Sequence, residues 1–219
     1  MATTSGEHGR GKHEPQYELP TAETLREAGD LIVKDEKGNE VLFKSLYEDR
    51  SGSQNLTIFI RHYFCGSCED YIRTISQELP PSLLSSSTPR TNLTIIGCGD
   101  VTPIPSWRTR TMHNILGADT GFPVYTDPSR KLYAKLGMLS SMSTGDSTPS
   151  YVKQGPVKTA LLSMKAAMMD PTNVFSGGSP SQLGGEMLFV EGEVVWFKRM
   201  RHAQDHAEVA ELKEVLGLQ

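Results

Sequence analysis

The chain has 219 residues, and its 22 lysines and arginines against 26 aspartates and glutamates give a formal net charge of -4. That length favours one domain with additions over two domains, and it is enough to bury a real core. The mild acidity gives no indication of nucleic-acid or membrane binding, and no apolar run approaches the roughly 20 residues of a membrane span.

Residues 1–18 are polar, lack hydrophobic periodicity and contain no apolar signal core. We therefore expect a disordered tail ahead of a single domain over residues 19–219, and no export by a signal peptide. The chain has 3 cysteines, an odd number, which argues against a disulfide framework. A reduced, cytoplasmic compartment is favoured, and there a Cys-x-x-Cys pair is catalytic or binds metal.

A short helix and a hairpin are expected after the tail. Residues 20–28 have a helical pattern that Thr21 can cap. The apolar runs 31–33 and 41–43 flank a polar turn that contains Gly38, which predicts a β-hairpin.

The next stretch joins a strand to a helix through two cysteines. The β-branched and aromatic run over 56–61 predicts a buried strand, and Cys65 and Cys68 follow it. Apolar residues then recur at helical spacing, at Ile72, Ile75 and Leu79. The first turn of a helix has unpaired N–H groups and a positive dipole end, which stabilise a thiolate and lower its pKa. The sequence therefore predicts a nucleophilic thiol at this junction.

The rest of the chain alternates between strands and helices. Up to residue 136 we expect a loop at 80–91, a strand at 93–98, a helix at 105–116, a strand at 122–126 and a helix at 127–136. Beyond it we expect a linker at 140–155, a Met-rich helix at 157–169, a loop at 171–185, a hairpin of 187–190 with 194–197, and a helix at 205–216. This order is the thioredoxin-type plan, in which the four main strands share one central sheet.

Three motifs occur in register along the chain. They are Phe59-Ile60-Arg61-His62-Tyr63-Phe64-Cys65-Gly66-Ser67-Cys68, Val124-Tyr125-Thr126-Asp127-Pro128-Ser129-Arg130-Lys131-Leu132-Tyr133, and Gln182-Leu183-Gly184-Gly185 before the hairpin. Together they resemble the AhpC/TSA antioxidant family of peroxiredoxin-like proteins, in its thioredoxin-like AAED branch, over roughly residues 25–217. The resemblance implies an α/β thioredoxin-like fold, a central mixed sheet flanked by helices, with an insertion over 139–185. It also implies thiol redox chemistry and peroxide reduction.

Two positions depart from the patterns of related proteins. Peroxiredoxins carry Pro-x-x-x-Thr-x-x-Cys, and here Cys65 stands at the threonine position while Arg61 stands at the proline position. Thioredoxin has a cis-proline before its hairpin strand, where this chain has Gly184 and Gly185. Glycines allow close backbone approach but remove the usual device for docking an extended peptide. A small-molecule thiol enzyme is therefore favoured over a general protein disulfide reductase.

The candidate catalytic pair is Cys65 with Cys68. A redox pair is favoured over zinc, because structural zinc needs four ligands and a set with His62 and Cys98 has no standard spacing. For Cys98, a buried thiol at a strand end is favoured over a resolving role. We expect no metal and no cofactor.

Supporting and substrate-binding residues are expected around this pair. The candidates that could supply positive charge to the thiolate are Arg61, His62, Arg199 and Arg201. The alternative for His62 is strand-end packing, and for the last two arginines it is solvated charge. The residues expected to line the substrate site are Tyr63, Phe64, Gly184 and Gly185. Asp205 and His206 are expected as the N-cap and first turn of the last helix.

The preferred hypothesis is a peroxiredoxin-type enzyme in which one thiolate attacks a peroxide and the other cysteine closes a disulfide. The thioredoxin analogy favours Cys65 as the attacking sulfur, and alignment with the peroxiredoxin motif favours Cys68. The second hypothesis is a fold repurposed to bind or tailor a small apolar metabolite, with Met164–Met169 and the loop around Phe175 covering a pocket. The expected partners are a small-molecule peroxide or disulfide and an external thiol reductant, and a homodimer stays open.

Overall fold

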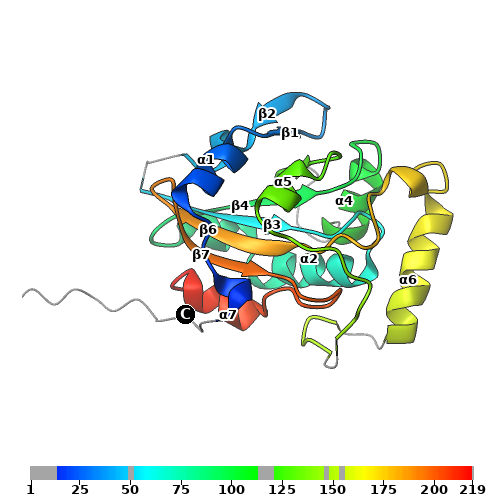
Figure 1. Ribbon diagram of the computed structural model, residues 1–219. Helices are drawn as coiled ribbons and strands as arrows, with labels where there is room; N and C mark the ends of the chain where they lie inside the picture. Colours follow the sequence, from blue (N-terminus) through cyan, green and yellow to red (C-terminus); the bar gives the residue numbers. More distant parts are fainter. Residues whose placement is uncertain (1–13, 49–51, 113–120, 146–147, 153–155, 219) are drawn as a thin grey trace, which may run out of the picture.

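The computed structural model describes residues 14–48, 52–112, 121–145, 148–152 and 156–218. Within them, seven strands form one mixed sheet in the order β2-β1-β5-β4-β3-β6-β7 (Figure 1). The strands are β1 Ile32–Lys34, β2 Glu40–Leu42, β3 Gln54–Phe59, β4 Thr91–Gly97, β5 Val124–Thr126, β6 Gly185–Val190 and β7 Glu193–Arg199. Strands β3, β4 and β5 are parallel, and β6 and β7 add an antiparallel hairpin beside β3. The predicted central sheet, terminal hairpin included, is confirmed.

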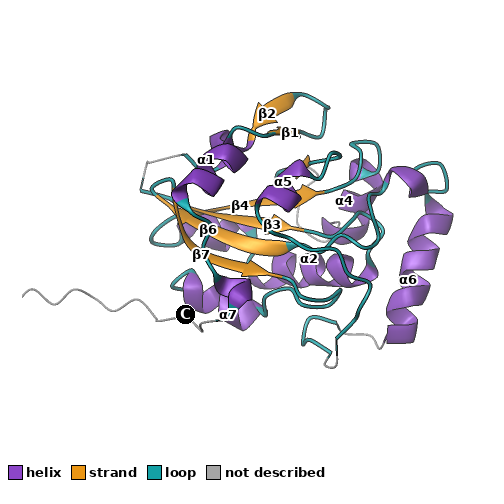
Figure 2. Cartoon of the chain, in the orientation of Figure 1, coloured by secondary structure: helices purple, strands orange, loops and turns teal. Residues whose placement is uncertain are grey.

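Helices lie on both faces of this sheet (Figure 2). The α-helices are α1 Ala22–Gly29, α2 Gly66–Glu78, α3 Pro81–Ser86, α4 Ile104–Met112, α5 Lys131–Lys135, α6 Pro156–Met169 and α7 Val209–Val215. Short 3-10 turns are η1 Pro15–Tyr17, η2 Phe43–Leu46 and η3 Val174–Ser176. Helix α2 contacts α4, α6 and α7, whereas α1 contacts α5 and η2. In the described part of the chain, no helix combines the length and the apolar character needed to cross a membrane.

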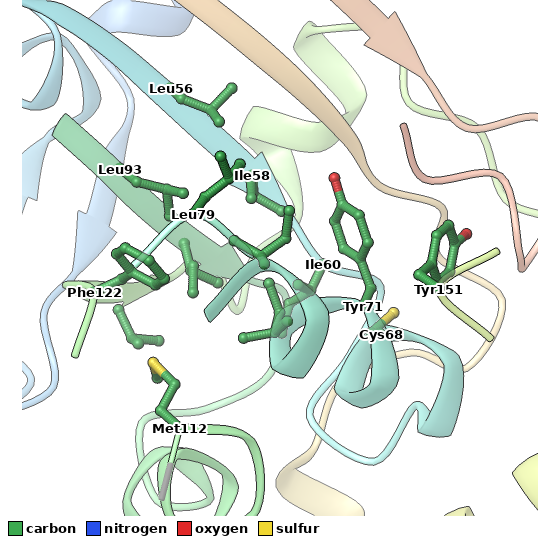
Figure 3. Close-up of a cluster of buried hydrophobic side chains, with 14 of the residues drawn as sticks. Leu56, Ile58, Ile60, Cys68, Tyr71, Leu79, Leu93, Met112, Phe122 and Tyr151 are labelled. Carbon is green, nitrogen blue, oxygen red and sulfur yellow. The ribbon is translucent and has the colours of Figure 1, made fainter. Parts of the chain in front are cut away.

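Strand β3 lies between two hydrophobic clusters. Ile58 points toward α2, where it joins Ile72 and Leu79 in one cluster (Figure 3). Phe59 points to the opposite face and packs with Phe189 in the other cluster. Successive side chains of a strand alternate between faces, so the apolar residues of β3 contribute to both clusters. Burial of each such side chain stabilises the fold by about 2 kcal/mol.

Three helices differ from the sequence-based expectation. The helix expected over 127–136 is α5, which begins only at Lys131. Residues 80–91, expected as loop, contain α3, because proline is tolerated in a first helical turn and Leu84 buries its side chain. The C-terminal helix begins at Val209 with Glu208 as its N-cap, so the expectation that Asp205 caps this helix is wrong.

The predicted disordered tail is wrong for residues 14–18. They form η1 and pack on the C-terminal elements, where Tyr17 Oη donates to Glu211 at 2.8 Å and its ring lies 6.4 Å from that of Trp196. Gln16 is buried. This segment has no local hydrophobic pattern that would predict its structure. It is ordered by contacts with β7 and α7, which lie far away in the sequence. Residues 1–13 of the predicted tail lie outside the described residues.

The segment over 139–185 runs between α5 and β6. A bridge between Ser140 and Gln182 ties its two ends together, and α6 lies in the middle of the segment against α2. The predicted Met-rich helix is confirmed, but Met164 is 61% exposed and Met168 is 78% exposed. These methionines therefore face outward, and the expectation that they cover an apolar pocket is wrong.

Candidate dithiol site

The candidate site lies where β3 gives way to α2. The parallel strands β3 and β4 end side by side, and the chain then turns through residues 60–65 into the helix. Cys65 is the N-cap of α2, with extended backbone, and Glu69 N donates to its carbonyl at 2.9 Å. Cys65 therefore lies at the N-terminus of a 13-residue helix, at the positive end of its dipole, although its side chain makes no capping hydrogen bond.

The two cysteines form a close pair. Cys68 Sγ donates to Cys65 Sγ at 2.9 Å, and Ser67 Oγ lies 3.2 Å from Cys65 Sγ. Both thiols are free and buried, with 4% of Cys65 and 0% of Cys68 exposed. Side chains three residues apart on a helix are neighbours, so a disulfide can close here with little backbone movement.

The surroundings separate the pKa values of the two thiols. The hydrogen bond from Cys68 and the charge of Arg61 hold the pKa of Cys65 well below its usual value, although burial opposes them. Burial, with the adjacent Cys65, raises the pKa of Cys68 well above its usual value. The favoured state is a Cys65 thiolate that accepts a hydrogen bond from a Cys68 thiol.

Arg61 supplies the positive charge at this pair. Its Nη1 donates to Cys65 Sγ at 3.4 Å, its Nε donates to Gln182 O at 3.1 Å, and its Nη2 donates to Pro180 O. Two carbonyls of the 139–185 segment thus hold the guanidinium against the sulfur. Burial lowers the pKa of His62 below its usual value of about 6.5, so the imidazole is neutral at pH 7. Of Arg61 and His62, the two neighbouring candidates predicted from the sequence, Arg61 therefore supplies the positive charge.

The structure gives Arg199 and Arg201 other partners. Arg199 donates to Leu136 O at 2.7 Å and to Glu18 O at 2.6 Å, and its guanidinium stacks on a phenylalanine ring. The side chain of Arg201 is 60% exposed and pairs with Asp205 at 3.1 Å. Both arginines bind other segments of the chain and not Cys65, so their expected support of the thiolate is not found.

Tyr63 and Phe64 are core residues in this structure. Tyr63 is fully buried, its Oη donates to Tyr125 O at 3.1 Å, and its ring meets Trp107 edge to face. Phe64 is buried under Gly177. Their bulky apolar side chains stabilise the turn that carries Cys65, and their part in a substrate site stays a prediction.

Gly184 and Gly185 are also buried. A Cβ on Gly184 would strike the carbonyl oxygen of Phe59, and one on Gly185 would strike that of Lys198. The predicted close backbone approach is therefore present, but it is made by the chain's own strands β3 and β7 and not by a substrate.

A buried ion network holds the cysteine turn, and sequence reasoning missed its main member. Arg110 of α4 pairs with Glu69 at 2.9 Å and donates from Nη2 to Tyr63 O at 3.0 Å. Its guanidinium also lies over the ring of Phe64. Glu69 pairs with Arg73 at 3.1 Å as well. Only this last pair, four residues apart on a helix, has a signal in the sequence.

Two further candidates are accounted for by packing. Cys98 is a buried thiol at the end of β4, as predicted; its Sγ donates to Arg61 O at 2.9 Å, and burial raises its pKa to about 11. His206, expected in a first helical turn, is instead buried, with Nδ1 2.6 Å from Glu186 Oε1 and its ring stacked on Tyr71. Among the residues that the structure describes, no three His, Cys, Asp or Glu side chains are placed to hold a metal ion.

Comparison with known proteins adds to this geometry. The sequence model described as AhpC/TSA antioxidant enzyme matches residues 75–202, a range that begins after both cysteines of the pair. The chain is 30% identical over 203 residues to Peroxiredoxin-like 2C of Takifugu rubripes, covering 89% of this chain and 82% of the relative. It is 28% identical over 196 residues to Peroxiredoxin-like 2C of Homo sapiens, covering 87% and 79%.

Solved structures of peroxiredoxins share the fold. A cysteine mutant of peroxiredoxin 6 from Arenicola marina superposes with a TM-score of 0.55 at 14% identity, covering 86% of this chain and 69% of that one. A cysteine mutant of peroxiredoxin Q from Xanthomonas campestris gives a TM-score of 0.52 at 12% identity, covering 91% and 93%. At these identities the likeness shows the fold alone, and it confirms the predicted α/β thioredoxin-like architecture.

Proposed function

We propose that this chain, which belongs to the AhpC/TSA antioxidant enzyme family of peroxiredoxin-like proteins, reduces a peroxide through Cys65 and Cys68. The observation that supports this most is the 2.9 Å contact between the two sulfurs, with Arg61 Nη1 3.4 Å from Cys65 Sγ. A thiolate is the nucleophile in thiol chemistry, and only Cys65 has the surroundings that favour one. We therefore assign the attack to Cys65, one of the two options that the sequence left open.

The first step is attack of the Cys65 thiolate on the terminal, hydroxyl oxygen of the peroxide ROOH. A sulfur–oxygen bond forms and the oxygen–oxygen bond breaks, which gives Cys65 sulfenic acid and RO⁻. The departing RO⁻ takes a proton from solvent and leaves as ROH. The guanidinium of Arg61 stabilises the negative charge as it moves from sulfur to oxygen.

The second step uses the neighbouring thiol. Cys68 Sγ attacks the sulfur of the sulfenic acid, its proton leaves with the hydroxyl as water, and a Cys65–Cys68 disulfide forms. An external dithiol then reduces this disulfide by exchange, gives up two electrons and becomes a disulfide itself. The pair of thiols is thereby restored for another cycle.

Rapid mixing of the reduced protein with one equivalent of hydrogen peroxide, followed by thiol counting, tests this proposal. We expect wild type and Cys98→Ser to lose two thiols each, because Cys98 is not used. We expect Cys68→Ser to give a sulfenic acid that dimedone traps in one turnover, and Cys65→Ser to be unreactive. Peroxide consumption by Cys65→Ser at the wild-type rate would show that the assignment of the attacking sulfur is wrong.

A further inference from the structure

Helix α6 exposes several large apolar side chains in its described C-terminal part, residues 161–169. Four of its large apolar residues lie within three helical turns and are exposed: Leu161 56%, Met164 61%, Met168 78% and Met169 66%. Two small residues of the helix face inward: Ala166 is buried, and Ser163 Oγ accepts a hydrogen bond from Gly66 N of α2. A surface helix ordinarily has the opposite arrangement. The outward face of α6 lies at the edge of the molecule in Figure 1, and an exposed apolar patch of this kind is typical of an interaction site.

The apolar surface continues beyond the helix. Phe175 in η3, which follows α6 along the chain, is 97% exposed. We call the set of Leu161, Met164, Met168, Met169 and Phe175 the α6 surface. Lys165 is also exposed among these residues, and α6 contains no acidic residue.

Helix α6 and the residue after η3 bind the backbone close to Cys65. Gly66 N donates to Ser163 Oγ of α6 at 3.0 Å, and Tyr63 N donates to Gly177 O, next to η3, at 2.9 Å. Both donors flank Cys65, which is 4% exposed. A large molecule can reach the buried Cys65–Cys68 disulfide only after neighbouring segments move. A partner that binds the α6 surface more tightly when these segments have moved would favour that state.

We propose that the α6 surface docks a protein dithiol that reduces the Cys65–Cys68 disulfide. This rests on the function proposed above. Methionine-rich and aromatic surfaces are typical of protein interfaces. Lys165 lies between Met164 and Met168, so a partner with carboxylates around an apolar centre fits the surface best. A second copy placed on a two-fold axis through this centre would bring two lysines together. The net charge of -4 disfavours an anionic membrane.

The exchange is balanced as follows. A thiolate of the docked protein attacks Cys65 Sγ, the more exposed sulfur, and the Cys65–Cys68 bond breaks. Cys68 leaves and is protonated. The second thiol of the partner attacks its own sulfur of the mixed disulfide and releases Cys65 as a thiolate. The partner is left oxidised, and this chain has regained two thiols.

Comparing two reductants on the oxidised protein tests the docking. The disulfide is formed with diamide, so that the test does not depend on peroxide activity. Reduction is then followed with thioredoxin, kept reduced by its reductase and NADPH, and separately with dithiothreitol. The variant Met164→Ser/Met168→Ser/Phe175→Ser is expected to lower kcat/KM for thioredoxin about tenfold and to leave the dithiothreitol rate unchanged. The control Ile32→Ser/Leu42→Ser changes apolar residues that are 49% and 40% exposed in the first hairpin, and it should behave as wild type.

Four results would overturn the docking proposal. The first two concern the triple variant's rate of disulfide reduction: an equal loss with both reductants, or no loss with thioredoxin. The other two are dissociation of a wild-type dimer by the triple substitution, and binding of wild type but not the variant to anionic phospholipid vesicles. The third would identify the surface as a self-contact and the fourth as a lipid contact. Failure of the proposed function gives a different result, since the reduced protein would then not consume hydrogen peroxide although its diamide-formed disulfide is still reduced. The mutated side chains are exposed, so unchanged thermal unfolding is expected of each variant.

Discussion

Arg61 determines the chemistry of the site at the level of single residues. The position is occupied by proline in the peroxiredoxin pattern, yet here a guanidinium lies 3.4 Å from Cys65 Sγ. Its other nitrogens are held by Gln182 O and Pro180 O, so the charge is fixed in place and little reorganisation is needed when a thiolate forms. Burial alone would raise the pKa of both thiols. The side-chain contacts of Cys65 reverse that effect for this one sulfur.

Replacement of Arg61 by Met is expected to raise the pKa of Cys65. The depressed pKa means that the wild-type rate with peroxide holds as pH falls through 8.5, the usual thiol pKa, and declines only below the lowered value. In Arg61→Met this decline moves to higher pH, and the rate at pH 7 falls by about tenfold or more. Thiolate absorbance at 240 nm against pH measures the shift. Arg201→Met, a change at an exposed arginine, is the control, and an identical titration in both variants would contradict the role of Arg61.

At the level of elements, the start of α2 is held by α4. Arg110 reaches from α4 to Glu69 in the first turn and to the carbonyl of Tyr63 in the preceding turn. Burial raises the pKa of Glu69, and the two arginines beside it oppose that effect. The direction of the cysteine turn therefore depends on a contact between helices 41 residues apart in sequence.

Breaking this link should destabilise the protein. Arg110→Met leaves the nearly buried carboxylate of Glu69 with Arg73 alone and the carbonyl of Tyr63 without its donor, at a cost of about 3 kcal/mol. The double variant Glu69→Gln/Arg110→Met should be more stable than Arg110→Met, because no unpaired charge remains. Urea unfolding of the three proteins measures this. A double variant less stable than either single variant would contradict the pairing.

At the scale of the whole molecule, the two ends of the described chain meet on β7. Tyr17 donates to Glu211 of α7, and Lys198 of β7 pairs with the same carboxylate at 3.0 Å. Arg199 binds the carbonyl of Glu18. Residues from both ends of the described chain thus pack beside β7, the last strand of the sheet.

Tyr17→Ala is expected to reduce stability by about 1–2 kcal/mol, because it removes a hydrogen bond and a ring contact from β7 and α7. Thermal unfolding should shift by a few degrees for a chain of this size. Glu14→Ala, at an exposed residue of the same segment, is the control. If Tyr17→Ala melted with wild type, the contacts of residues 14–18 would be without consequence for the fold.

The sequence by itself determined the order of elements and the position of the thiols. Mainly apolar, β-branched runs such as 56–61 and 93–98 predict strands because a strand buried on both faces is mostly apolar, and Cys65 and Cys68 follow closely after the first of them. Burial of Cys98 also follows from its place at a strand end. These are local patterns, and local patterns are visible in one chain.

Only the tertiary structure decided which charges meet the sulfur and which faces stay open. From the sequence, Arg61 and Arg199 were both candidates to supply positive charge to the thiolate. In the structure, the carbonyls of residues 180 and 182 hold Arg61 against Cys65, whereas Arg199 donates to the carbonyl of residue 136. The role of Arg110 at the site cannot be predicted from the sequence, because it depends on the packing of α4 against α2. Which side chains of α6 are exposed depends on which face of the helix packs against α2. Contacts between residues distant in the chain have no period and no spacing, which is why the sequence could predict the thiols but not their surroundings.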